Sequence, residues 1–263
     1  MIIDFHTHCF PEKIAAAALK KLSKASGNPE PFHAGSHNDL IAFLDSKGID
    51  KAVVLNIATN PKQQKNVNDF ASSLLEYESL IPFGSVHPDS PDAVEELYRI
   101  KEMGLKGVKF HPDYQNFFVD EERMFPLYEK ISELGLITVF HAGVDIGVPG
   151  DVHCTPDRLA NALPVFQSAP VVAAHMGGWL MWPQVLEKLV GLELYFDTSF
   201  SFNRMPPYWA HDIIKAHGAE KILLGSDMPW SATDNEIRFI DSLDLDENER
   251  ELILSKNAEK LLF

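Results

Sequence analysis

Eight short apolar runs, separated by segments with helical periodicity, constrain the fold of this chain more than any other feature. The runs are rich in β-branched residues and cover residues 2–5, 52–57, 80–86, 105–110, 136–140, 171–174, 194–196 and 222–224. Helix-period segments lie between and after them, at residues 39–47, 62–77, 92–103, 122–134, 157–166, 181–189, 207–216 and 235–242. Strictly alternating strands and helices predict a parallel sheet, and eight such units predict an α/β fold, a closed (β/α)8 TIM barrel. A doubly wound open sheet is the alternative fold, but no phosphate-binding glycine loop follows the first run.

Capping residues mark the ends of several predicted helices, but no sequence feature marks a boundary between domains. Thr155-Pro156 and Ser90-Pro91 place an N-cap residue before a proline, and Gly48 follows a helical pattern as a C-cap residue does. Asp246 and Glu249 have capping-box spacing and open a last helical region. No repeat, low-complexity tract or linker interrupts residues 1–263, so we expect one domain over that range. The irregular stretch 26–36, after the first helix, is expected to lie over the mouth of the barrel.

Composition limits the partners of the chain. The formal net charge is −15, and phosphate binding needs clustered lysine and arginine, so nucleic acid and anionic membrane surfaces are not expected partners. No apolar stretch is long enough for a membrane span, and no targeting signal precedes the first run. The only cysteines are Cys9 and Cys154, which favours a cytoplasmic location with both thiols reduced. A small-molecule substrate is the expected partner, and self-association is left open.

Metal-capable or ionisable side chains follow most of the eight runs. Active sites in barrels of this kind form at the carboxyl ends of the strands. In chain order, these ends carry His6 and His8, then His87, then Lys109 and His111, then His141, His175, Asp197 and Asp227. Strand side chains alternate between two faces, so His6 and His8 point the same way and can share one ion. A pair of polar residues at a strand end is the plainer interpretation of His6-Thr7-His8, but the later strand ends favour the metal site.

The ordered set resembles the amidohydrolase superfamily. The similarity is closest to the branch that contains aminocarboxymuconate-semialdehyde decarboxylase, γ-resorcylate decarboxylase and pyrone-dicarboxylate hydrolase. The matching segments are Asp4-Phe5-His6-Thr7-His8, Gly107-Val108-Lys109-Phe110-His111-Pro112, Phe140-His141-Ala142-Gly143, Ala174-His175-Met176-Gly177-Gly178, Gly225-Ser226-Asp227-Met228-Pro229-Trp230 and the tail Asn257-Ala258-Glu259-Lys260-Leu261-Leu262. These segments span essentially the whole chain.

The resemblance implies that His6, His8, His141 and Asp227 bind one divalent metal. Imidazoles and a carboxylate suit Zn²⁺, with Mn²⁺ as the alternative. The resemblance further implies that Asp227 and His175 are catalytic, Asp227 as the base and His175 as an acid, base or electrostatic stabiliser. Asp197 is expected to support the site from behind the ligands.

Lys109 has two interpretations. Some amidohydrolases carboxylate a lysine on the fourth strand and use it to bridge two metals, but the closer branch is mostly mononuclear. Otherwise Lys109 is a charged side chain that pairs with Asp227 or with a substrate carboxylate. We predict substrate-binding roles for Lys109, His111, Trp230 and Arg204.

Three functions fit these predictions. The first is a metal-dependent hydrolase that uses a metal-activated water on a small, carboxylate-bearing ester, lactone or amide. The second uses the same site for non-oxidative decarboxylation of an unsaturated or aromatic acid. The third is a non-catalytic barrel that serves as a binding module. The fold does not choose between them.

Overall fold

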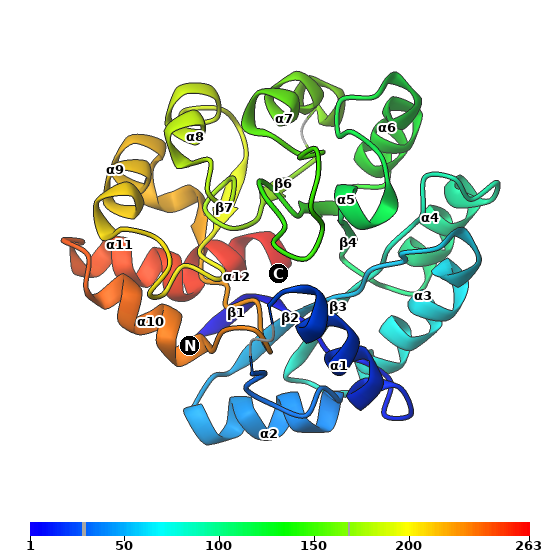
Figure 1. Ribbon diagram of the computed structural model, residues 1–263, viewed down its shortest axis with the longest axis horizontal. Helices are drawn as coiled ribbons and strands as arrows, with labels where there is room; N and C mark the ends of the chain where they lie inside the picture. The colour runs from blue at the N-terminus through cyan, green and yellow to red at the C-terminus, as the bar shows by residue number, and fades with distance from the viewer. Residues whose placement is uncertain (28–29, 168) are drawn as a thin grey trace.

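Eight parallel strands form the centre of the protein (Figure 1). A computed structural model describes residues 1–27, 30–167 and 169–263. The strands are β1 (Ile3–Thr7), β2 (Lys51–Leu55), β3 (Leu80–Phe83), β4 (Gly107–Phe110), β5 (Ile137–Phe140), β6 (Val171–Ala173), β7 (Tyr195–Asp197) and β8 (Ile222–Leu223). Continuous ladders join β1 to β3 and β4 to β8 in chain order.

Backbone hydrogen bonds close the two seams between these ladders. At the β3–β4 seam, Gly84 N donates to Gly107 O over 2.9 Å and Lys109 N donates to Gly84 O over 2.8 Å. At the β8–β1 seam, Phe5 N donates to Leu224 O and Asp227 N donates to His6 O. The sheet therefore returns to its first strand, which confirms the predicted (β/α)8 barrel and excludes the open sheet.

Most of the helices form an outer ring around the strands (Figure 1). The α-helices are α1 (Ala15–Ala25), α2 (His37–Lys47), α3 (Gln64–Ser73), α4 (Ala93–Glu102), α5 (Pro112–Gln115), α6 (Phe125–Glu133), α7 (Pro156–Ala162), α8 (Trp182–Lys188), α9 (Pro207–His217), α10 (Thr233–Asp241), α11 (Glu247–Glu251) and α12 (Asn257–Leu262). Short 3-10 turns are η1 (Pro61–Gln63), η2 (Leu74–Glu76), η3 (Glu122–Met124), η4 (Leu163–Phe166) and η5 (Ala219–Lys221), and η6 (Leu252–Lys256) is a π-helical segment. In Figure 1, α1 lies inside the ring, in front of β2 and β3. None of the helices among the described residues combines the length and the apolar character needed to cross a membrane.

The barrel interior is a separate hydrophobic cluster. Its strand residues are Ile3, Phe5, Val53, Leu55, Ile81, Phe83, Ile137, Val139, Val172 and Leu223. Ala258 and Leu262 of α12 join the same cluster, so the last helix packs against the end of the barrel where the strands begin. Because this end is filled by side chains, the opposite end is where a site can open.

Strands and caps differ in detail from the sequence prediction. The runs 52–57 and 80–86 end as strands at Leu55 and Phe83. Between the chain segments that follow these two strands, side chains take over the hydrogen bonding: Asn56 Nδ2 donates to Phe83 O, and Ala58 N donates to Ser85 Oγ. Thr155 is the N-cap residue of α7, as predicted, and Asp246 and Glu249 form the expected capping box. The Ser90 prediction was wrong, since α4 begins at Ala93 with Asp92 as its N-cap residue. Positions 28 and 29 of the irregular stretch lie outside the described residues.

Candidate metal centre

One large pocket opens at the carboxyl ends of the strands. It has a volume of about 650 Å³. The predicted site residues that line it are His6, His8, Lys109, His111, His141, His175, Asp227 and Trp230. Arg204 is not among its lining residues. Its guanidinium lies 3.7 Å from the ring centroid of Phe200, and Phe200 lines the pocket.

Backbone irregularities aim the central side chains. The pairing of β1 with β2 shifts register between Asp4 and Thr7, and such a bulge changes the face that the following side chains occupy. Alternation alone would point His6 and His8 away from the side that Phe5 occupies. With the bulge, Phe5 belongs to the barrel interior and His6 and His8 line the pocket above it. Asp227, four residues after β8, has a φ of 68°, in the left-handed region that non-glycine residues rarely adopt. Left-handed residues of this kind cluster at functional sites.

A glycine lets two of these strand ends approach each other closely. A Cβ added to Gly225 would lie 2.9 Å from His6 Cβ and 3.2 Å from Asp197 Cβ. Only glycine fits between these two side chains without displacing one of them. Gly225 thus lets His6 of β1 and Asp197 of β7 stay in contact across the chain that follows β8.

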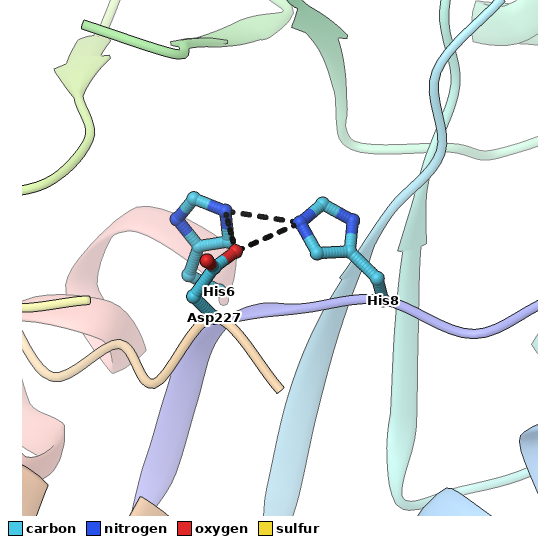
Figure 2. A group of neighbouring side chains, drawn as sticks. All are labelled: His6, His8 and Asp227. Atoms are coloured by element: carbon cyan, nitrogen blue, oxygen red, sulfur yellow. Dashed lines mark hydrogen bonds and ion pairs between the residues drawn. The ribbon is translucent and has the colours of Figure 1, made fainter. Parts of the chain in front are cut away.

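Three potential ligand atoms meet at the centre of the site (Figure 2). His6 Nε2 lies 3.2 Å from His8 Nε2 and 3.3 Å from Asp227 Oδ1, and His8 Nε2 lies 3.2 Å from the same oxygen. Ligand atoms about 2.0–2.2 Å from a zinc ion in tetrahedral geometry are separated by roughly 3.3–3.6 Å, so this triangle is close to the size that a divalent ion requires.

The outer nitrogens of both imidazoles fix the tautomers. His6 Nδ1 donates to Asp197 Oδ2 over 2.8 Å, and His8 Nδ1 donates to the Leu55 carbonyl over 2.8 Å. Each neutral ring therefore presents an unprotonated Nε2. Two nitrogen lone pairs and a carboxylate oxygen consequently face one another with no proton between them. A cation resolves this repulsion, so the residues fit a bound metal ion.

Burial favours the protonation states that ligation needs. Desolvation, helped by the nearby Lys109 charge, lowers the pKa of His6 to about 3. Burial alone would raise the pKa of Asp227, but its close contact with His8 and the neighbouring His6 and His175 hold it below its ordinary value. Neutral imidazoles and an ionised carboxylate are the forms that bind a divalent ion.

A second group of ligand-capable atoms lies beside the first. It contains His111, His141 and Asp145, with His111 Nε2 3.0 Å from Asp145 Oδ2. The structure thus groups His141 with these two residues rather than within the His6, His8 and Asp227 triangle. Asp145 was not predicted, because it lies in the loop five residues after β5 and has no neighbouring motif.

A chain of hydrogen bonds sets the tautomer of His141. Ser199 Oγ donates to Asp197 Oδ1, and therefore accepts from His175 Nδ1 over 2.9 Å. His175 Nε2 is then an acceptor, and His141 Nδ1 donates to it over 3.0 Å. The remaining nitrogen of His141, Nε2, is buried and without a hydrogen-bond partner in the described structure. This bare nitrogen has the state of a metal ligand, which agrees with the prediction for His141 without testing it.

Lys109 is a buried cation at the floor of the pocket. Its side chain is 1% exposed, and its Nζ has no hydrogen-bond partner among the described residues. Desolvation lowers the pKa of Lys109 to about 8, against the opposing effects of Asp197 and Asp227. An unpartnered buried ammonium is costly, so this atom is prepared for an anionic ligand.

A closed α/β barrel with histidines and a carboxylate gathered at the carboxyl ends of its strands is an architecture typical of metal-dependent enzymes. The amidohydrolase family model matches residues 3–263, and the chain belongs to that family. The match confirms the resemblance seen in the sequence, and with it the enzyme class. A search of curated proteins found no match.

Solved structures share the fold at low sequence identity. An uncharacterized TIM-barrel protein from Bordetella bronchiseptica is 20% identical, with a TM-score of 0.80 over 99% of this chain and 98% of that chain. The 5-carboxyvanillate decarboxylase from Sphingomonas paucimobilis is 15% identical, with a TM-score of 0.75 over 99% and 98%. A dihydroxybenzoic acid decarboxylase from Polaromonas sp. JS666, with bound manganese and the inhibitor 2-nitroresorcinol, is 16% identical, with a TM-score of 0.75 over 99% and 96%.

Proposed function

We propose that the protein is a metal-dependent hydrolase of carboxylate-bearing esters, lactones or amides. The observation that carries this proposal is the convergence of His6 Nε2, His8 Nε2 and Asp227 Oδ1 as three unprotonated acceptors within 3.3 Å of one another. These residues would hold one divalent ion, and His141 would be the fourth ligand through its unpartnered Nε2. Zn²⁺ suits this donor set, and the manganese of the Polaromonas enzyme supports Mn²⁺ as the alternative.

When bound, the ion supplies Lewis acidity, which polarises a carbonyl group and lowers the pKa of a water molecule from about 15.7 to about 7. Asp227 faces both imidazoles through Oδ1, which leaves Oδ2 to accept the proton of the attacking water. His175 lines the same pocket and is the candidate for transferring a proton to the leaving group. Its Nε2 accepts from His141 in the structure, so this role requires the ring to release that partner and to take up at Nε2 the proton that Asp227 removes from the water.

Lys109 supports a carboxylate on the substrate. Its Nζ is buried at the floor of the pocket without a partner, and a substrate carboxylate there would form a charge-assisted hydrogen bond. This contact would position the scissile carbonyl relative to Asp227 and His175. The same buried nitrogen is also the atom that would carry a carboxylate bridge in a two-metal enzyme.

Non-oxidative decarboxylation is the second candidate. It is supported by the two decarboxylases of aromatic acids that share the fold over nearly the whole chain. The same residues would serve it, with Lys109 binding the acid and a proton delivered to carbon in place of the departing carboxyl group. A non-catalytic barrel is disfavoured, because the family match spans the barrel and every predicted ligand position carries a metal-capable side chain.

Product analysis separates the two reactions. The protein, loaded with one equivalent of Zn²⁺ or of Mn²⁺, is incubated with a panel of carboxylate-bearing lactones, esters and aromatic acids. The proposal predicts metal-dependent release of titratable acid without CO₂, and the Asp227→Asn variant as an inactive control. Metal-dependent CO₂ release from an aromatic acid would establish the second candidate, and turnover that survives metal removal would refute both.

A further inference from the structure

The pocket continues well beyond the polar floor described above. A second part is lined mostly by apolar side chains from the loop after β1, from α1, from the end of β2 and from α3, with Lys21 and Asn66 among its polar residues. We call this part the apolar arm, and it consists of Phe10, Ile14, Ala18, Leu22, Ile57, Val67 and Phe70. The metal ligands and Lys109 line the same pocket, so the arm is continuous with the site.

One face of α1 forms a wall of the arm. Ile14, Ala18 and Leu22 are four residues apart and therefore lie on one face of the helix. Ile14 is 51% exposed although it is a large apolar residue. The neighbouring Ala17 is exposed and does not line the pocket. This face of α1 is thus directed at the pocket, whereas Ala15 and Leu19 of the same helix are buried against the protein.

Most of these side chains lie outside the core of the described structure, and of the seven only Phe70 packs against one of its hydrophobic clusters. Ile14, Ala18, Leu22, Ile57 and Val67 belong to none of its three hydrophobic clusters. Apolar surface that lines an open cavity gains little for the fold, and it gains free energy when a ligand removes it from water. The arm therefore has the properties of a binding surface.

Packing behind α1 holds this wall in place. Leu19 is buried, and a Cβ added to Gly35 would lie only 2.8 Å from its Cδ1. Gly35 has a φ of +100°, which favours glycine, and its carbonyl accepts a hydrogen bond from Phe10 N over 2.8 Å. The arm is thus a preformed part of the pocket.

We propose that the substrate is amphipathic, with an apolar tail that occupies the arm while its reactive polar end lies over His6, His8 and Lys109. The placement of the polar end rests on the proposed function, whereas the tail site rests on the arm itself. A pocket of about 650 Å³ is large for a compact polar acid and falls within the range of sites that bury drug-sized ligands. The substrate class is therefore an ester, lactone or amide with an alkyl or aryl chain of several carbons.

A chain-length series of metal-binding probes tests the tail site. Straight-chain hydroxamates from acetohydroxamate to decanohydroxamate are titrated calorimetrically into the zinc-loaded protein. Each added methylene should tighten binding about two- to fourfold until the arm is filled, as expected for partial to full burial of a CH₂ group. An affinity that does not depend on chain length would overturn the proposal.

Two variants assign the gain to the arm. Ala18→Trp should remove most of the gain for the long chains and leave acetohydroxamate binding unchanged, and Ile14→Asp, at an exposed position, should act the same way if Ala18→Trp does not fold. Ala17→Trp, on the outer face of α1, is the matched control and should bind every hydroxamate of the series with the affinity of the unmodified protein. Equal weakening of acetohydroxamate and decanohydroxamate by both arm variants would refute a tail site.

Straight-chain alkanoates on the metal-free protein separate this proposal from the proposed function. If the protein bound no metal but decanoate still bound more tightly than butanoate in an Ala18-dependent manner, the arm would stand and the metal centre would fail. If acetohydroxamate bound the zinc-loaded protein and no probe gained affinity with length, the metal centre would stand and the arm would fail.

Discussion

Asp197 is predicted to control the metal site without touching the ion. Its Oδ2 accepts from His6 Nδ1 over 2.8 Å, and its Oδ1 accepts from the backbone nitrogens of His175 and Ser199 over 3.0 and 3.1 Å. In Asp197→Asn, only one oxygen remains. If that oxygen keeps the two backbone bonds, the amide NH₂ faces His6 Nδ1 and forces the ring proton onto Nε2, where it points at the other ligands.

The opposite amide orientation is less favourable, because it places the NH₂ group against two buried backbone N–H groups, each costing about 1–3 kcal/mol if left unsatisfied. The variant should therefore lose His6 as an effective ligand. Removing a partner of a metal-ligating histidine typically costs about 10- to 100-fold in metal affinity, or about 1.4–2.7 kcal/mol. We expect a loss of this size for Asp197→Asn, with the fold retained.

Competition with a chromophoric zinc chelator measures this loss, and circular dichroism checks the fold. Asp212→Asn is the matched control, since Asp212 also contacts a histidine, His211, over 3.3 Å but lies on the surface. The control should bind zinc as the unmodified protein does. Wild-type zinc affinity in a folded Asp197→Asn protein would refute the tautomer argument on which the metal site rests.

Three further predictions separate ligation, substrate binding and stability. His8→Ala should lose the metal, whereas His175→Ala should keep most of it and lose about 100-fold or more in turnover, and comparable metal loss in both would make His175 a ligand. Lys109→Met should weaken carboxylate-bearing inhibitors about 10- to 100-fold while leaving their uncharged amides unaffected, and equal effects on both would remove Lys109 from substrate binding. Burial raises the pKa of Glu236 to about 8 from 4.5, so its contribution to stability is present at low pH and is lost as the pH rises through 8. Glu236→Gln should therefore reduce the fall in melting temperature between pH 5 and 9, and an unchanged fall would contradict the assignment.

The sequence predicted those features that depend on strand order and side-chain alternation. The eight runs specify the barrel, and alternation brings His6 and His8 to one face of β1, while Lys109 and His111 share the pocket from β4. It did not predict the bulge in β1, which lets His6 and His8 face the pocket on the same side of the strand as the interior residue Phe5, because a bulge depends on the register with β2.

The loop residue Asp145 and the orientation of α1 were also harder to predict, because both depend on contacts between segments that are distant in the sequence. Asp145 contacts His111 only because the chain after β5 folds back over the mouth, and no local pattern encodes that path. The apolar face of α1 is visible in the sequence as Ile14, Ala18 and Leu22, but periodicity alone indicates a face that packs into the core. The structure instead directs this face at the pocket.

Anomalous diffraction from crystals grown with one equivalent of Zn²⁺ tests the central claim most directly. The structure contains two neighbouring groups of ligand atoms, and the anomalous peak shows which of them binds the ion. We predict a single peak within bonding distance of His6 Nε2, His8 Nε2 and Asp227. A peak confined to His111, His141 and Asp145, or no bound zinc at all, would contradict the proposed metal centre.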